Sequence, residues 1–154
     1  MRIDDLDAPR AVPGAADAIL RELERLGLHW DGPVLFQHHR KERYEAAIRE
    51  LLDASDAYVC ACSRREVGHV PYPGTCRHGL PAGRTGRSVR LRTPDDDITI
   101  SDLIQGEVVL SIARTSGDFV IRRGDGLPAY HLATVIDDSD LGISEVVRGA
   151  DLLE

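Results

Sequence analysis

The chain has 154 residues, of which 42% are hydrophobic and 29% charged. This ordinary globular composition excludes a disordered tail, a fibre and a low-complexity linker. No apolar run approaches the roughly 18 residues of a membrane span, and Met1 opens onto charged sequence without a signal peptide, so we expect a cytoplasmic protein with no membrane contact. Three cysteines cannot all pair, which favours a thiol or metal role over a disulfide framework.

The positive charge is carried almost entirely by arginine, because Lys41 is the only lysine beside 18 arginines. A glycine-rich phosphate loop with its lysine is absent. Seven of the arginines lie between Ser63 and Arg92 beside a single acid, Glu66, in a chain of net charge −7. An acidic chain with one basic segment can bind a polyanion at that segment without binding polyanions over the rest of its surface. The alternative is a solvated arginine-rich loop.

Two amphipathic helices are predicted in the first third of the chain. Apolar residues at helical spacing predict a helix that starts after Pro13-Gly14 and ends at Gly27. A turn follows at Trp30–Pro33, and a second helix is predicted within residues 39–55, with His38-His39 at its start.

Short strands dominate the remainder. The spacing of Ser63 and Glu66 predicts a helix capping box, and the stretch from Gly68 to Gly86 has almost nothing to fill a core. Val89–Arg92 alternates like a strand with one solvent-exposed face. The other predicted elements are strands at 58–60, 98–104, 107–113 and 119–121, a turn at 124–126, a helix at 129–135 and a final buried strand at Glu145–Val147. This order predicts an α/β domain interrupted by a β-rich insertion.

The cysteines form a candidate metal site, since Cys60, Cys62 and Cys76 fall within 17 residues. Zinc prefers four tetrahedral thiolate or imidazole ligands, and a zinc ion would order the coreless stretch attached to these cysteines. Tyr72, His69, His78 or water could provide the fourth ligand, and chemistry alone favours a histidine because imidazole binds zinc without losing a proton. The alternative is three unconnected buried thiols.

Four segments carry a resemblance to a known family: RIDDLDAPR, GLHWDGPVLFQ, YPGTCRHGL and AYHLATVIDD…EVVRGADLL. The chain resembles the glutamyl-Q tRNA(Asp) synthetases over essentially its whole length. The resemblance implies a class I synthetase catalytic domain of Rossmann type, at residues 1–57 and 106–154. A zinc-bearing, β-rich insertion that binds the acceptor stem would interrupt it at residues 58–105. It also implies a monomer that activates L-glutamate with ATP and Mg²⁺ and attaches it to the queuosine base of tRNA(Asp).

The resemblance also implies roles for individual residues. The structural zinc ligands fall on Cys60, Cys62, Tyr72 and Cys76. The glutamate-binding residues fall on Tyr130 and Arg148, and an acidic position that is usually glutamate falls on Asp4. Tyrosine is an acceptable ligand where zinc lowers the phenol's pKa.

The side chains at the glutamate-binding positions match the charged groups of the amino acid. Arg148 can hold a carboxylate through a bidentate fork, Asp4 can pair with the ammonium group, and Tyr130 can orient it through its hydroxyl. The phenol and the guanidinium must then converge on one amino acid. Without the resemblance, the alternatives are a surface arginine and a half-buried core tyrosine.

Other charged residues receive weaker assignments. Asp137, Asp138 and Asp140 are interpreted as a helix end and turn, with a Mg²⁺ site as the alternative. We expect Arg64, Arg65 and Arg77 to contact tRNA phosphates, which gives position rather than sequence readout.

Two nucleotide-binding signatures of the family have no counterpart in this sequence. The histidine-containing signature would precede RIDDLD, and the lysine-bearing loop would follow RGADLL. We therefore expect a central fragment that does not make glutamyl-adenylate alone. The alternatives are a fragment of an ordinary glutamyl-tRNA synthetase and a non-catalytic, zinc-stapled tRNA-binding module.

Overall fold

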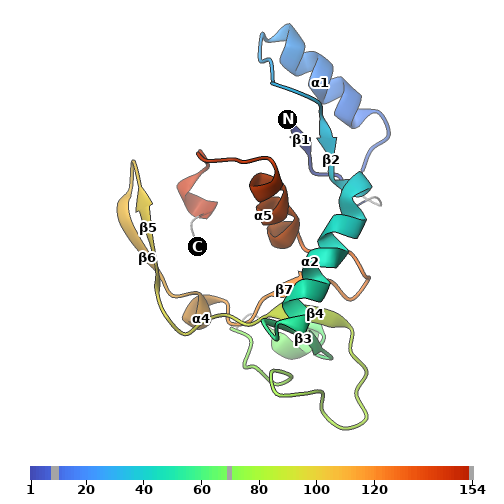
Figure 1. Ribbon diagram of the computed structural model, residues 1–154, viewed down its shortest axis with the longest axis vertical. Helices are drawn as coiled ribbons and strands as arrows, with labels where there is room; N and C mark the ends of the chain where they lie inside the picture. Colours follow the sequence, from blue (N-terminus) through green and yellow to red (C-terminus); the bar gives the residue numbers. More distant parts are fainter. Residues whose placement is uncertain (8–10, 69–70, 153–154) are drawn as a thin grey trace.

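The computed structural model of the chain describes residues 1–7, 11–68 and 71–152. Helix α2 (Lys41–Asp53) runs through the middle of the molecule and links two groups of elements (Figure 1). Helix α1 (Ala15–Arg25) and a two-stranded sheet lie at one end, and a three-stranded sheet lies at the other (Figure 1). The hairpin of β5 (Ile98–Asp102) and β6 (Gly106–Leu110) stands apart from both groups.

The first group contains the predicted amino-terminal helix. Helix α1 spans Ala15–Arg25, and Gly27 beyond its end has a φ of 73°, a left-handed conformation that favours glycine. Strand β1 (Arg2–Ile3) pairs in parallel with β2 (Leu35–Phe36). The prediction of this helix and its stop is confirmed.

The second predicted helix is also confirmed. Gln37–Arg40 form a 3₁₀ turn that leads into α2, so His38-His39 lie at the helix start as expected. Helix α2 buries Tyr44 and Ile48, and α5 (Tyr130–Asp140) packs beside it. Helix α5 extends beyond the predicted end at residue 135.

The three-stranded sheet is antiparallel, in the order β3 (Ala57–Cys60), β4 (Ser88–Leu91) and β7 (Val120–Arg122). Its central strand departs from the sequence prediction, because Val89 and Arg90 are both buried and the pairing with β7 shifts register between them. The expected solvent-exposed face of Val89–Arg92 is therefore wrong at Arg90. A β-bulge can re-aim a side chain in this way.

Three further short elements lie within the described residues. Helix α3 (Arg64–Val67) begins with the predicted capping box, in which Ser63 and Glu66 each accept a hydrogen bond from the other's backbone N–H. Helix α4 (Ile112–Thr115) occupies the end of the predicted strand 107–113, so that strand ends earlier than expected. A 3₁₀ turn follows at Ala150–Leu152.

Among the described residues, the buried side chains form three clusters. One cluster joins α2 and α5 through Tyr44 and Ala133, and a second joins α2 to the three-stranded sheet through Ile48 and Val89. The third lies around the cysteines and includes Tyr58 and Tyr72. The predicted cysteine site therefore has a small core of its own.

The final predicted strand is wrong. Residues 143–149 have no regular structure, and Val147 is 97% exposed. A run of apolar residues becomes a buried strand only where neighbouring strands pair with it, and no pairing is formed there within the described residues. The same described residues contain no helix long and apolar enough to cross a membrane.

Candidate metal centre and substrate residues

The three cysteines converge on one point. Their sulfur atoms all lie within 4.8 Å of one another, and Cys62 Sγ is 3.8 Å from Cys76 Sγ. Cys60 and Cys62 come from the end of β3 and the turn after it, while Cys76 comes from the long loop before β4. All three are free thiols. The geometry excludes the alternative of unconnected cysteines.

The phenol of Tyr72 completes this group. Its Oη lies 3.4 Å from Cys60 Sγ and 3.7 Å from Cys62 Sγ. A tetrahedral zinc ion with bonds of ordinary length would separate two sulfurs by about 3.7 Å and a sulfur and an oxygen by about 3.5 Å. These three distances are close to tetrahedral values, which makes Tyr72 Oη and the sulfurs of Cys60, Cys62 and Cys76 suitable donors for such a metal.

The structure describes one of the two histidines considered as the fourth ligand. His78 is exposed and does not belong to the cluster of potential ligands found among the described residues, and His69 lies outside those residues. Among the described residues, Tyr72 is the candidate fourth ligand that lies beside the cysteines.

The surroundings favour a thiolate at Cys60. Burial raises the pKa of this thiol, but hydrogen bonds from Tyr72, the Cys62 backbone and Arg90 outweigh burial and lower the pKa to about 7. In contrast, burial and the neighbouring cysteines raise the pKa of Tyr72, so its phenol stays protonated without a metal. The site thus offers an anionic sulfur to a soft divalent cation.

Tyr72 is positioned by a short backbone bridge to Gly117. Its backbone N–H donates to the Ser116 carbonyl at 3.2 Å, and the Tyr72 hydroxyl accepts from the Cys76 N–H at 2.9 Å. A β-carbon on Gly117 would lie 2.8 Å from the Tyr72 carbonyl oxygen, and Gly117 has a φ of 62°. Only glycine fits both constraints.

Replacing Gly117 by alanine is therefore expected to move Tyr72 away from the cysteines and weaken metal binding at least ten-fold. Gly83→Ala is the matched control, because Gly83 also has a positive φ but no atom within 4 Å of an added β-carbon. Competition with a chromophoric chelator measures both affinities. Equal affinities for the two variants would contradict this role of Gly117.

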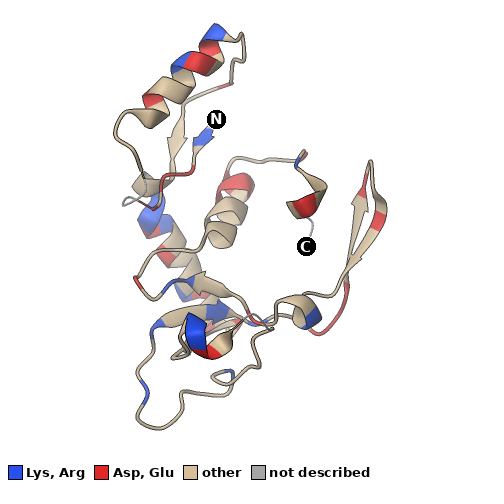
Figure 2. Cartoon of the chain, turned by 180° about the vertical axis from the view of Figure 1, so that it is seen from behind, with Lys and Arg blue, Asp and Glu red and all other residues tan. Residues whose placement is uncertain are grey.

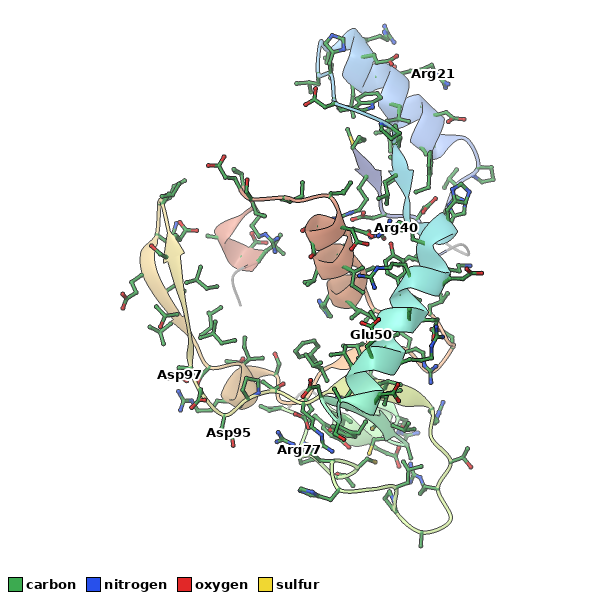
Figure 3. All side chains as sticks on the ribbon, in the orientation of Figure 1. Arg21, Arg40, Glu50, Arg77, Asp95 and Asp97 are labelled. Carbon is green, nitrogen blue, oxygen red and sulfur yellow. The ribbon has the colours of Figure 1, made fainter. Side chains whose placement is uncertain are left out.

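The arginines of the basic segment divide into two groups. Helix α3 carries basic residues (blue in Figure 2). They are Arg64 and Arg65, which are exposed and form no ion pair within the described residues. Arg77, labelled in Figure 3, instead comes from the loop before β4. It donates to the Thr93 carbonyl at 3.1 Å and lies 3.6 Å from the Asp118 carboxylate. Of the three predicted phosphate contacts, Arg64 and Arg65 are thus free to meet a ligand, whereas Arg77 is engaged within the chain.

The predicted glutamate-binding residues lie in three separate segments. Asp4 follows β1, Tyr130 begins α5 and is 60% exposed, and Arg148 lies in the exposed segment before the last 3₁₀ turn. Arg2 links two of these segments, since its Nε donates to Asp4 at 2.7 Å and its Nη1 to Asp138 of α5 at 2.5 Å. No hydrogen bond or ion pair joins Asp4, Tyr130 and Arg148 in the part of the chain that the structure describes, so their convergence stays a prediction.

Asp137 has a structural role. Its carboxylate is fully buried and accepts hydrogen bonds from Gln37 at 2.8 Å, Tyr44 at 2.9 Å and Arg40 at 2.9 Å. Asp140, at the last residue of α5, pairs with Arg40 and Arg43. These partners occupy the carboxylates and favour the predicted helix end over a Mg²⁺ site.

Sequence reasoning missed two residues beside the metal centre. Arg90 is buried against Cys60 and Tyr72, and Asp118 accepts from the Tyr58 hydroxyl at 2.6 Å and the Thr93 N–H at 2.8 Å. An arginine that alternates with apolar residues is ordinarily on the solvent side of a strand. For Arg90, the only indication of a role at the cysteines was that its strand lies next to the strand that carries the first cysteine.

Comparison with known proteins places this geometry in a family. The family model of the class I tRNA synthetases (E and Q), catalytic domain, matches residues 1–70 and 80–154. The chain belongs to this family. Its mixed α/β structure is that of the family's catalytic domain, and the resemblance found in the sequence motifs is confirmed.

Relatives named glutamyl-Q tRNA(Asp) synthetase are similar over nearly the entire chain. The protein of Chromobacterium violaceum is 49% identical over 99% of this chain and 54% of its own length. The protein of Dechloromonas aromatica is 51% identical with the same two coverages. The chain thus spans about half the length of the curated relatives it matches.

The fold is also similar to that of a solved synthetase. The crystal structure of a glutamate tRNA ligase from Elizabethkingia meningosepticum in complex with its amino acid superposes with a TM-score of 0.82 at 27% identity. The match covers 99% of this chain and 37% of that one.

Proposed function

We propose that this chain is the glutamate-binding and zinc-bearing part of a glutamyl-Q tRNA(Asp) synthetase. The complete enzyme would activate L-glutamate with ATP and Mg²⁺ and transfer it to the queuosine base of tRNA(Asp). The observation that carries this proposal is identity near 50%, across almost the whole chain, to proteins of that name.

Zinc is proposed to be structural, held by Cys60, Cys62, Tyr72 and Cys76. The spacing of the four donor atoms supports this assignment. When bound, zinc would fix the loop that precedes β4. The proposed boundaries are 58–105 for the zinc-bearing insertion and 1–57 and 106–154 for the catalytic part, although β7, beyond residue 105, pairs with β4.

For the substrate, we propose that Arg148 grips the side-chain carboxylate of glutamate and that Asp4 and Tyr130 meet its ammonium group. The exposure of Tyr130 and Arg148 supports their availability to a ligand. Asp4 already faces the guanidinium of Arg2 at 2.7 Å, so a substrate ammonium would share or replace that partner. Arg64 and Arg65 are proposed to contact tRNA phosphates, with Arg77 nearby.

Product analysis tests the reaction. The enzyme that contains this chain is incubated with ATP, labelled glutamate and tRNA(Asp) bearing queuosine, and the nucleosides are separated by mass spectrometry. We expect the label on queuosine. Glutamate esterified to the 3′-terminal adenosine would instead assign the chain to a glutamyl-tRNA synthetase.

Calorimetry with a non-hydrolysable glutamyl-adenylate analogue tests the substrate residues. Arg148→Ala is expected to weaken binding about ten- to hundred-fold, because hydrogen bonds between charged groups contribute roughly 1.5–3 kcal/mol. Arg87→Ala, which removes another exposed arginine, is the control and should leave binding unchanged. Wild-type protein that binds tRNA but no analogue would favour the non-catalytic module.

A further inference from the structure

Arg90 occupies an unusual position for an arginine. It lies on the central strand of the three-stranded sheet and is only 7% exposed. The register shift between Val89 and Arg90 allows consecutive residues of β4 to be buried. A buried arginine is costly unless its charge is compensated, so its partners identify its role.

Those partners are two of the four proposed metal ligands. Arg90 Nε donates to Cys60 Sγ at 3.3 Å, and the guanidinium carbon lies 3.8 Å from the centre of the Tyr72 ring. Arg90 Nη1 donates to the Asp118 carbonyl at 2.6 Å, which fixes the guanidinium from the other side. No carboxylate is paired with Arg90 among the ion pairs of the described residues.

The net charge of the four ligands with bound zinc explains why Arg90 is buried beside them. Three thiolates and one phenolate around a divalent cation leave an excess of two negative charges, and Cys60, Cys76 and Tyr72 are buried. Backbone N–H groups supply part of the compensation, since Ala61 donates to Cys76 Sγ and Cys76 donates to Tyr72 Oη. Among the described residues, the guanidinium of Arg90 is the full positive charge that donates a hydrogen bond to one of the proposed ligands.

We propose that Arg90 is a positioning residue of the metal centre: it compensates the excess negative charge of a three-cysteine, one-tyrosine zinc site and holds the Tyr72 ring and the Cys60 sulfur in place. This inference rests on the zinc site proposed above. It explains how a tyrosine, rather than a histidine, serves as the fourth ligand here. A neutral imidazole would leave one negative charge fewer to compensate.

Metal titration of purified variants tests the proposal. Zn²⁺ affinity is measured by chelator competition, and ligand geometry by the absorption spectrum of the Co²⁺-substituted protein. Arg90→Met is expected to weaken Zn²⁺ binding ten- to hundred-fold, the range typical of residues that hold metal ligands in place. In a Tyr72→Phe background the same change is expected to cost clearly less, because one ligand charge is already removed.

Arg92→Met is the matched control. Arg92 lies two positions along the chain and loses the same charge, but its guanidinium lies over Tyr58 and donates to the Arg77 carbonyl, without contact with a ligand. The Zn²⁺ affinity of the Arg92→Met variant should stay within about two-fold of wild type. If Arg90→Met does not fold, Arg90→Lys replaces it, with intermediate affinity and an altered Co²⁺ spectrum expected.

The outcomes separate the two proposals. A wild-type chain that binds no metal would overturn the zinc site and this inference with it. One zinc per wild-type chain, with unchanged affinity and Co²⁺ spectrum in the Arg90 variant, would overturn the role of Arg90 alone.

Discussion

Replacing Cys76 by serine is expected to abolish stoichiometric zinc and to unfold the loop between α3 and β4. Cys76 is 1% exposed, and its sulfur lies 3.8 Å from Cys62 Sγ and accepts the Ala61 N–H. Most other side chains between residues 71 and 87 are exposed, so little besides the cysteine cluster can order this segment. Elemental analysis measures the metal, and hydrogen exchange of the loop amides measures its order.

Thr75→Ser is the matched control, since Thr75 is the exposed neighbour of the ligand. This variant should retain one zinc per chain, and its loop amides should be protected from hydrogen exchange as in the wild type. A chelator added to wild-type protein is expected to reproduce the exchange pattern of Cys76→Ser. Full zinc occupancy in Cys76→Ser, or an unchanged loop after chelation, would contradict the structural role of the metal.

Replacing Asp137 by alanine is expected to lower the free energy of unfolding by about 3–5 kcal/mol, the usual range for breaking a buried charge pair. The carboxylate is fully buried, and its loss leaves the Gln37 amide, the Tyr44 hydroxyl and the Arg40 Nε without their acceptor. These donors tie the start of α2 to α5. Urea unfolding followed by far-UV circular dichroism measures the change.

Asp140→Ala provides the comparison, because Asp140 ends the same helix and pairs with Arg40 and Arg43 but is partly exposed. We expect a much smaller loss, since surface ion pairs contribute little. Similar losses for the two variants would show that the buried carboxylate is not the main link between the helices.

The parts of the fold that sequence predicted well depend on local patterns. The stop of α1 at Gly27 and the Ser63–Glu66 capping box are each set within a few residues. The convergence of the three cysteines was predictable for a similar reason, because three thiols within a short stretch that has few apolar residues are typical of a zinc site.

The errors arose where tertiary contacts override a local pattern. Arg90 was expected on the exposed face of its strand, since a strand sequence does not reveal a register shift or the cysteine and tyrosine side chains that contact Arg90. Glu145–Val147 has the composition of a buried strand, but a strand needs partners, and none pairs with this segment among the described residues. The local sequence does not indicate that the Asp137 carboxylate is buried, because its three hydrogen-bond partners lie about 100 residues away along the chain.

The choice of Tyr72 over a histidine came from the family resemblance, and the placement of its hydroxyl beside two sulfurs agrees with it. Arg148 lies in residues 143–149, which have no regular structure, so local sequence does not specify its position relative to Tyr130 at the start of α5.

The short segment of residues 116–118 has a wider consequence. It holds the backbone of Tyr72 through Ser116 and Gly117, and it anchors the guanidinium of Arg90 through the Asp118 carbonyl. Because a single stretch of three residues contacts both Tyr72 and Arg90, a shift of this stretch would displace the proposed oxygen donor and its proposed countercharge together. Ion release and opening of the neighbouring strands should therefore occur as a single cooperative transition, so that this region melts as one unit.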